Sequence, residues 1–149
     1  MRITSLGFRT DVGDADWRQS VGLAVRCFDS EPGDFLERRA AARRRVTQAG
    51  AGIWFGAFEN GRLLAQLGLF DAGDGYARYQ HVETDPAARG RGLAGTLVWA
   101  AGRAGREVLG ISTFVIVAEP AGAAIRIYQA CGFTARQNQL SFDRPPGLA

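Results

Sequence analysis

The chain has 149 residues, enough for one ordinary domain that buries roughly 68–70% of the surface exposed by its unfolded form. Its 46% hydrophobic and 22% charged residues are typical of a globular protein, and no apolar run approaches the ~20 residues of a membrane-spanning helix. All 18 basic residues are arginine, which excludes a Walker A site because that site needs a lysine, and a net charge of +3 is too small to indicate nucleic acid.

The beginning of the chain lacks the apolar block of a secretory signal, so we expect a cytoplasmic protein. Its two cysteines, Cys27 and Cys131, are too few for a disulfide framework and have no metal-ligand spacing. Because His81 is the sole histidine, we predict no metal site.

The first half of the chain predicts one strand followed by two helices. Residues 3–9 read as the strand, and apolar residues spaced three and four apart predict a helix over 14–28. A second helix begins at Asp34, with Glu37 at capping-box spacing, and ends near Gly50.

Three strands are predicted next. Strands over 53–58 and 62–70 flank Asn60-Gly61, a pair that favours a tight hairpin turn. Residues 71–75 read as a loop, and a strand over 76–84 ends at Asp85-Pro86.

The last part of the chain predicts two more helices, each followed by a strand. Helical spacing begins at Leu93 and stops at Gly110, and the run over 111–118 predicts a strand buried on both faces at the centre of the sheet. A helix begins at Pro120 and ends at Gly132, a strand over 133–143 closes the domain, and 145–147 form a tail. The order indicates a single α/β domain over 1–149, a mixed sheet covered by helices.

Gly90, Gly92 and Gly95 formally match GxGxxG, and Glu119 lies where a ribose-binding acid would be expected. This pattern allows an NAD(P)-dependent oxidoreductase. The match is weak, because a dinucleotide-binding loop follows its strand directly and opens a longer domain than the 59 residues left after Gly90.

The same loop resembles the pyrophosphate loop of the GNAT N-acetyltransferases. Arg89, Gly92 and Ala94 match the family pattern R/Q-x-x-G-x-G/A, and Ala124, Tyr128 and Gly132-Phe133 match a second family phrase in the right order. The resemblance spans about residues 53–142. It implies a GNAT-like fold with a mostly antiparallel sheet, acetyl-CoA as cofactor, and a small-molecule or peptide amine as acceptor.

The loop also has a physical reason to bind a diphosphate. The first amides of a helix have no internal partner and carry the positive end of the helix dipole, and glycines allow close approach. The predicted cofactor-binding residues of this loop are therefore Arg89, Gly90, Arg91, Gly92, Leu93, Ala94 and Gly95. The resemblance adds Val82 and Thr84 at the end of the preceding strand, where it implies that a backbone N–H polarises the thioester carbonyl.

Two residues are predicted to carry the chemistry. Tyr128 matches the tyrosine that in the family protonates the coenzyme A thiolate; the alternative is a core position on an apolar helix stripe. Glu83 is favoured as general base with water as a relay, against a structural role, and His81 and Glu119 are the other candidates.

The resemblance implies that Ala121 replaces an asparagine that contacts the cofactor in many members. Some of the cofactor binding must then come from other residues or be weaker. A CoA-binding module that has lost turnover is a second alternative to the enzyme. The run Arg38, Arg39, Arg43, Arg44 and Arg45 could attract an acidic acceptor, but such a run is more often the solvated face of a helix, which is the interpretation we favour. A homodimer is compatible with the sequence without being required by it.

Overall fold

The structure of the protein is a computed structural model that describes residues 2–5, 14–28 and 34–139. Five described strands form one sheet in the order β1-β2-β3-β4-β5, where only the β4–β5 pair is parallel. The strands are β1 (Arg2–Ser5), β2 (Gly52–Glu59), β3 (Arg62–Gly73), β4 (Tyr76–Thr84) and β5 (Thr113–Val115). The helices are α1 (Asp14–Phe28), α2 (Asp34–Gln48), the short 3₁₀ turn η1 (Pro86–Ala88), α3 (Leu93–Leu109) and α4 (Ala123–Ala130).

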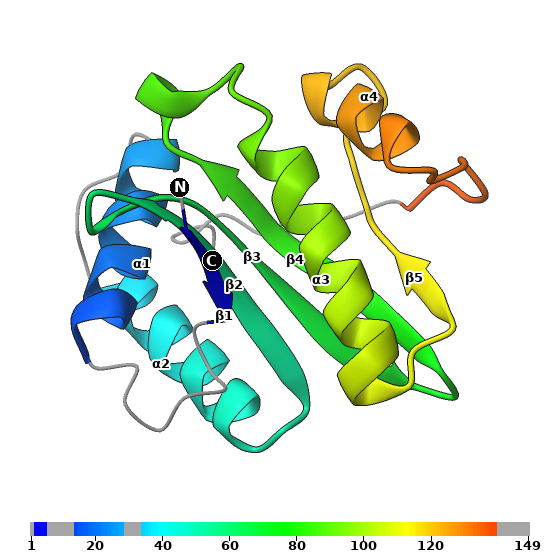
Figure 1. Ribbon diagram of the computed structural model, residues 1–149, viewed down its shortest axis with the longest axis horizontal. Helices are drawn as coiled ribbons and strands as arrows, with labels where there is room; N and C mark the ends of the chain where they lie inside the picture. The colour runs from blue at the N-terminus through cyan, green and yellow to red at the C-terminus, as the bar shows by residue number, and fades with distance from the viewer. Residues whose placement is uncertain (1, 6–13, 29–33, 140–149) are drawn as a thin grey trace, which may run out of the picture.

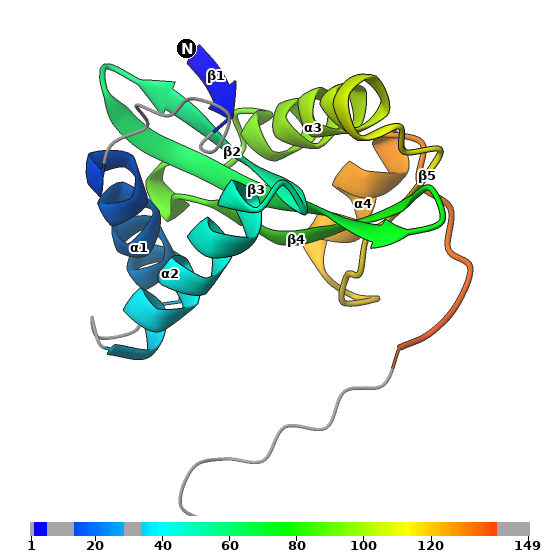
Figure 2. The ribbon, with the colours of Figure 1, turned by 90° about the horizontal axis from the view of Figure 1, so that it is seen from below.

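The helices cover both faces of the sheet (Figures 1 and 2). Helices α1 and α2 lie on one face and α3 and α4 on the other. Each face has its own apolar core: Trp17, Leu23 and Trp54 belong to the α1/α2 side, while Leu67, Leu97 and Tyr128 belong to the larger cluster on the α3/α4 side. Strands β2 and β3 are therefore buried along most of their length.

The predicted helices are confirmed, with one shifted start. Helices α1 and α2 begin at the predicted residues, and α3 ends at Gly110, which caps it with a left-handed φ of 67°. Helix α4 begins at Ala123, three residues after Pro120, and stops before Gly132. No described helix is both long enough and apolar enough to cross a membrane.

The Asn60-Gly61 hairpin is confirmed, because both residues take positive φ (49° and 78°), as a tight turn between β2 and β3 requires. The loop predicted over 71–75 is only partly right. Strand β3 continues to Gly73, which pairs with Tyr76, and the turn narrows to Asp74-Gly75.

The strand predicted at the sheet centre is wrong in place and burial. Strand β5 is short, lies at the edge of the described sheet, and exposes Thr113 and Val115 while Phe114 points inward. It pairs with β4 only opposite Tyr76–Arg78, because β4 is distorted further along. Residues 133–139 form no strand, and 140–143 lie outside the described residues, as do 6–9 of the first predicted strand.

Candidate active site

An irregularity in β4 decides which face carries the polar residues of the site. Gln66 of β3 pairs with Glu83, while Gly68 pairs with Gln80, so β4 has one residue more than β3 over this stretch. The extra residue is accommodated at His81, whose φ is +54°, and the side chains beyond it change face. Tyr79 therefore packs on the α3/α4 side, whereas His81 and Glu83 lie on the α1/α2 side.

Glu83 is buried and held by one residue of the neighbouring strand. Gln66 Nε2 donates to Glu83 Oε2 at 2.6 Å and to the Ser20 carbonyl at 3.1 Å. Gln66 Oε1 accepts from Ser20 Oγ at 2.5 Å and from Trp54 Nε1 at 3.2 Å. The amide is thus fully used, and it fixes the carboxylate. Among the described residues, Glu83 Oε1 has no hydrogen-bond partner although it is sealed from solvent.

Burial raises the pKa of Glu83 above its ordinary value, and the hydrogen bond from Gln66 and the charges of Arg43 and Arg39 oppose that rise. A carboxylate with a raised pKa is a stronger base once it is ionised. Glu83 therefore has the burial and the restrained geometry that a general base needs.

His81 lies beside Glu83 but in a cationic setting. Its Nδ1 is 4.0 Å from Glu83 Oε1 and 3.1 Å from a guanidinium nitrogen of Arg39. Burial and the charges of Arg43, Arg39 and Arg78 lower the pKa of His81 to about 4, so the imidazole is neutral at pH 7.

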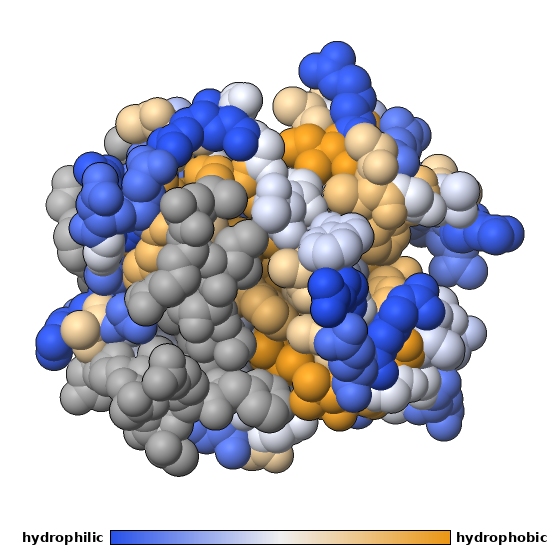
Figure 3. Space-filling view, in the orientation of Figure 1, coloured by the Kyte–Doolittle hydropathy of each residue, from blue (hydrophilic) through white to orange (hydrophobic). Residues whose placement is uncertain are grey.

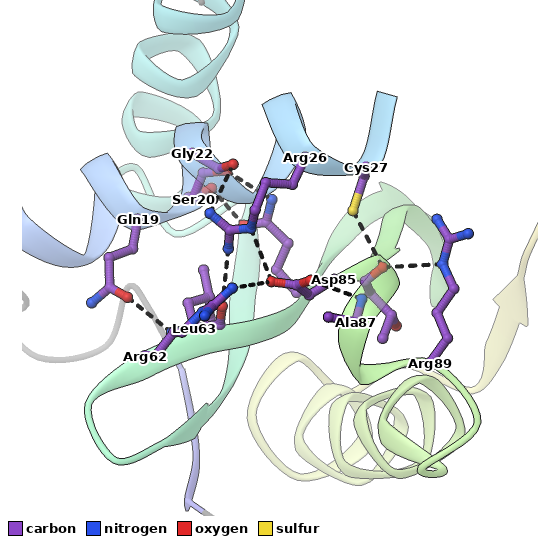
Figure 4. Close-up of polar contacts among 12 residues, drawn as sticks. Gln19, Ser20, Gly22, Arg26, Cys27, Arg62, Leu63, Asp85, Ala87 and Arg89 are labelled. Carbon is purple, nitrogen blue, oxygen red and sulfur yellow. Dashed lines mark hydrogen bonds and ion pairs between the residues drawn. The ribbon is translucent and has the colours of Figure 1, made fainter. Parts of the chain in front are cut away.

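The turn that leaves β4 is fixed by Asp85 (Figure 4). One carboxylate oxygen accepts from Arg26 of α1 and Arg62 of β3, each at 2.9 Å, and the other accepts from the Ala87 amide at 3.1 Å. The Thr84 carbonyl accepts from Cys27 Sγ and, at 3.5 Å, from Arg89 Nε. These bonds hold the start of the following loop against α1 and the β2–β3 hairpin.

The glycine loop ends in a row of amides without partners. Gly90 and Gly92 have φ of +75° and +76°, and a Cβ at either position would meet nothing within 4 Å. Gly92 is the N-cap of α3 and offers no side-chain cap, and the amides of residues 90–95 donate to no described residue. The next amide, Thr96 N, does have a partner: it donates to the Gly92 carbonyl. The loop can therefore present several N–H donors to one anion.

The other predicted loop residues have different positions. Arg89 is exposed, whereas Arg91 is held by Glu59 through contacts of 2.6 and 3.2 Å beside a cavity of about 420 Å³. Leu93 buries its side chain in the core, and only its backbone faces the loop. A Cβ on Gly95 would lie 3.7 Å from Ile127 and 3.9 Å from Cys131, so Gly95 lies where α3 and α4 pack together.

Two buried tyrosines on the α3/α4 side differ in how their hydroxyls are used. Tyr79 donates to the Val98 carbonyl at 2.8 Å, which is a structural bond. Tyr128 packs edge-on against Phe133, and within the described part of the chain its hydroxyl has no partner and is not sealed from solvent. Burial and, secondarily, Cys131 raise the pKa of Tyr128, so it keeps its proton at neutral pH.

The remaining predicted site residues do not lie in the polar cluster around Glu83. Val82 packs against the α3/α4 core and Glu83 faces the opposite side. Glu119 is exposed in the segment before α4, as is Ala121, so neither joins the cluster around Glu83. Sequence reasoning missed Gln66, whose signal was a lone amide inside the apolar run of β3.

The sheet does not support the oxidoreductase alternative. A dinucleotide-binding domain is built on parallel strands, whereas β2, β3 and β4 are antiparallel neighbours and the loop follows the last of them.

Comparisons with known proteins agree with this architecture. A model of the acetyltransferase (GNAT) family matches residues 17–133. A Trypanosoma brucei acetyltransferase is 20% identical, with a TM-score of 0.72 over 96% of this chain and 99% of that one. The aminoglycoside acetyltransferase AAC(6′)-Iy, solved with the bisubstrate analogue CoA-S-monomethyl-acetylneamine, is 18% identical, with a TM-score of 0.75 over 97% of both chains.

A ribosomal-protein-alanine N-acetyltransferase from Brucella melitensis is 17% identical, with a TM-score of 0.70 over 97% of this chain and 99% of that one. At such identities these likenesses establish the fold alone. No curated protein is similar enough in sequence to support a closer relationship.

Proposed function

The chain belongs to the acetyltransferase (GNAT) family, and we propose that it transfers an acetyl group from acetyl-CoA directly to a primary amine. The observation that carries this proposal is the row of unpartnered amides at the start of α3, opened by two glycines with left-handed φ. Solved structures of the same fold contain coenzyme A or an analogue linked to it, which supports acetyl-CoA as the cofactor.

The loop has the properties that a diphosphate requires. Among the described residues, none accepts a hydrogen bond from its amides and no side chain blocks Gly90 or Gly92, while Arg89 adds a positive charge nearby. Arg91 would have to leave Glu59 before it could take part, so we assign it a secondary role. Figure 3 shows hydrophobic surface where α3 begins beside α4, and such a surface suits the apolar parts of a long cofactor arm.

The edge of β4 that faces β5 is a second element of the proposed site. Because β5 pairs only with Tyr76–Arg78, no described strand covers this edge from Gln80 to Thr84. The Thr84 carbonyl already accepts from Cys27 and Arg89, so we assign the backbone N–H groups around Val82 and Thr84 to hold an extended ligand and to polarise its carbonyl oxygen.

Acetyl-CoA supplies the acyl group as a thioester, and the chain has to manage two protons. We assign Glu83 to remove the proton of the attacking amine, with a water molecule as relay because Oε1 is enclosed. We assign Tyr128 to protonate the departing thiolate, because its hydroxyl is unbonded among the described residues and its pKa is raised. These two groups lie on opposite faces of the sheet, Glu83 on the α1/α2 side and Tyr128 on the α3/α4 side.

Ligand-dependent thermal stability tests the proposal. Acetyl-CoA at saturating concentration should raise the melting temperature by several degrees, and NADH should not. Thiol release across a panel of primary amines then separates an enzyme from a CoA-binding module. Stabilisation by NADH alone would overturn the proposal, whereas acetyl-CoA binding without release for any amine would favour the module.

A further inference from the structure

A cationic cluster lies on the α1/α2 face of the sheet, away from the glycine loop. We call Arg39, Arg43 and His81 the arginine–histidine cluster. Helix α2 supplies the two arginines and the irregular part of β4 supplies the histidine. Arg39 reaches His81 Nδ1 at 3.1 Å, and the Arg43 guanidinium lies 4.8 Å from the ring centre of Trp54.

The cluster has more positive charge than the carboxylates of the described residues neutralise. Neither Arg39 nor Arg43 forms an ion pair with a carboxylate of the described residues, and both lie against aromatic rings. Arg78 adds a third guanidinium close enough to act on His81, and among the described acids Glu83 interacts with Arg39 and Arg43. Arg43 is 91% buried, so its charge is kept from water at a cost that a bound anion would offset.

The cluster brings a guanidinium and a carboxylate close to one histidine. A guanidinium nitrogen of Arg39 lies 3.1 Å from His81 Nδ1, and Glu83 Oε1 lies 4.0 Å from the same nitrogen. Glu83 Oε1 is enclosed, unpartnered and turned toward this group. An amine whose proton reaches Glu83 through a water molecule would therefore have the Arg39 guanidinium within reach of an anionic group on the same molecule.

We propose that the acceptor is an amine that also carries an anionic group, a carboxylate or a phosphate, and that Arg39 binds this group with Arg43 reinforcing it. This inference rests on the proposed acetyl transfer and specifies its substrate class. A guanidinium offers two parallel N–H donors to either anion. A polycationic acceptor would instead meet Arg39, Arg43 and Arg78 as like charges.

Matched acceptor pairs test the substrate class with the full-length protein. Thiol release is measured for alanine against ethylamine and for phosphoethanolamine against ethanolamine, with a polycationic aminoglycoside as a third arm. We expect kcat/KM to favour the anion-bearing member of at least one pair roughly tenfold or more, and the two pairs decide between carboxylate and phosphate.

Two neighbouring arginines provide the matched variants. Arg39→Gln should reduce this preference toward unity, mainly through KM. Arg38→Gln removes the same charge from a side chain that is 72% exposed and paired with Asp34, so it should keep the preference. Preference for the plain amines or for the aminoglycoside, or equal effects of the two variants, would overturn the inference. If acetyl-CoA fails to stabilise the protein, the proposed function falls first and this inference with it.

Discussion

Replacing Gln66 by leucine should be costly, because one buried amide serves three partners. The substitution removes bonds to Ser20, Trp54 and Glu83 and leaves the Trp54 N–H and the Glu83 carboxylate without them in a closed core. An unsatisfied buried group costs about 1–3 kcal/mol and a charged one more, while burying leucine recovers about 1 kcal/mol. We expect Gln66→Leu to lower the free energy of unfolding by about 3–4 kcal/mol at pH 7.

The loss should depend on Glu83. In a Glu83→Leu background no carboxylate is stranded, so Gln66→Leu should cost about 2 kcal/mol less there. Urea unfolding followed by circular dichroism measures all four corners of this double-mutant cycle. Gln48→Leu, at an exposed position on α2, is the control and should change stability by no more than about 0.5 kcal/mol.

The pH dependence of catalysis tests the hydrogen bond between Gln66 and Glu83 independently of stability. The hydrogen bond from Gln66 lowers the pKa of Glu83, so its loss should raise that pKa further and move the acidic limb of the pH–rate profile to higher pH. A Gln66→Leu loss below about 1 kcal/mol, or no coupling to Glu83, would refute the role assigned to this amide.

Three other substitutions test separate parts of the site. Gly92→Ala should destabilise the fold by roughly 1–2 kcal/mol and weaken acetyl-CoA binding in a thermal-shift titration, because alanine disfavours φ of +76°. The control Gly95→Ala meets only ordinary contacts and should leave both stability and binding nearly unchanged. Equal effects of the two variants would contradict the loop assignment. Tyr128→Phe should keep acetyl-CoA binding and lower kcat roughly 10²-fold or more. The control Tyr79→Phe should instead lose about 1 kcal/mol of stability, because it removes the hydrogen bond to Val98. An unchanged kcat in Tyr128→Phe would rule out the acid role. Because the pKa of Glu83 is raised in the folded state, the contribution of this group to stability is complete below about pH 4.5 and is lost as pH rises through the folded pKa. In parallel urea titrations, Glu83→Gln should therefore gain stability relative to the natural protein between acidic and neutral pH. A stability difference that does not change with pH would contradict the raised pKa.

The sequence by itself determined the local elements and the glycine turn that opens α3. Helical spacing identified α1, α2 and α3, Asn60-Gly61 identified the hairpin, and the glycines before Leu93 identified the start of a helix. These features depend on residues that are neighbours along the chain, where periodicity and turn chemistry act directly.

Only the tertiary structure decided what the polar residues do. The extra residue at His81 gives β4 its change of face, and only the pairing of Gln66 with Glu83 and Gly68 with Gln80 reveals it. The contacts from Arg39 to His81 and from Arg91 to Glu59 span 42 and 32 residues.

The position of strand β5 in the sheet was also not predictable from the sequence. Its apolar sequence predicted a central position, yet β5 pairs only with Tyr76–Arg78 of β4 and lies at the edge of the described sheet. Hydrophobic content reports that a segment can be buried, but the face and the neighbours of a strand depend on register across the sheet, which no local pattern in one strand specifies.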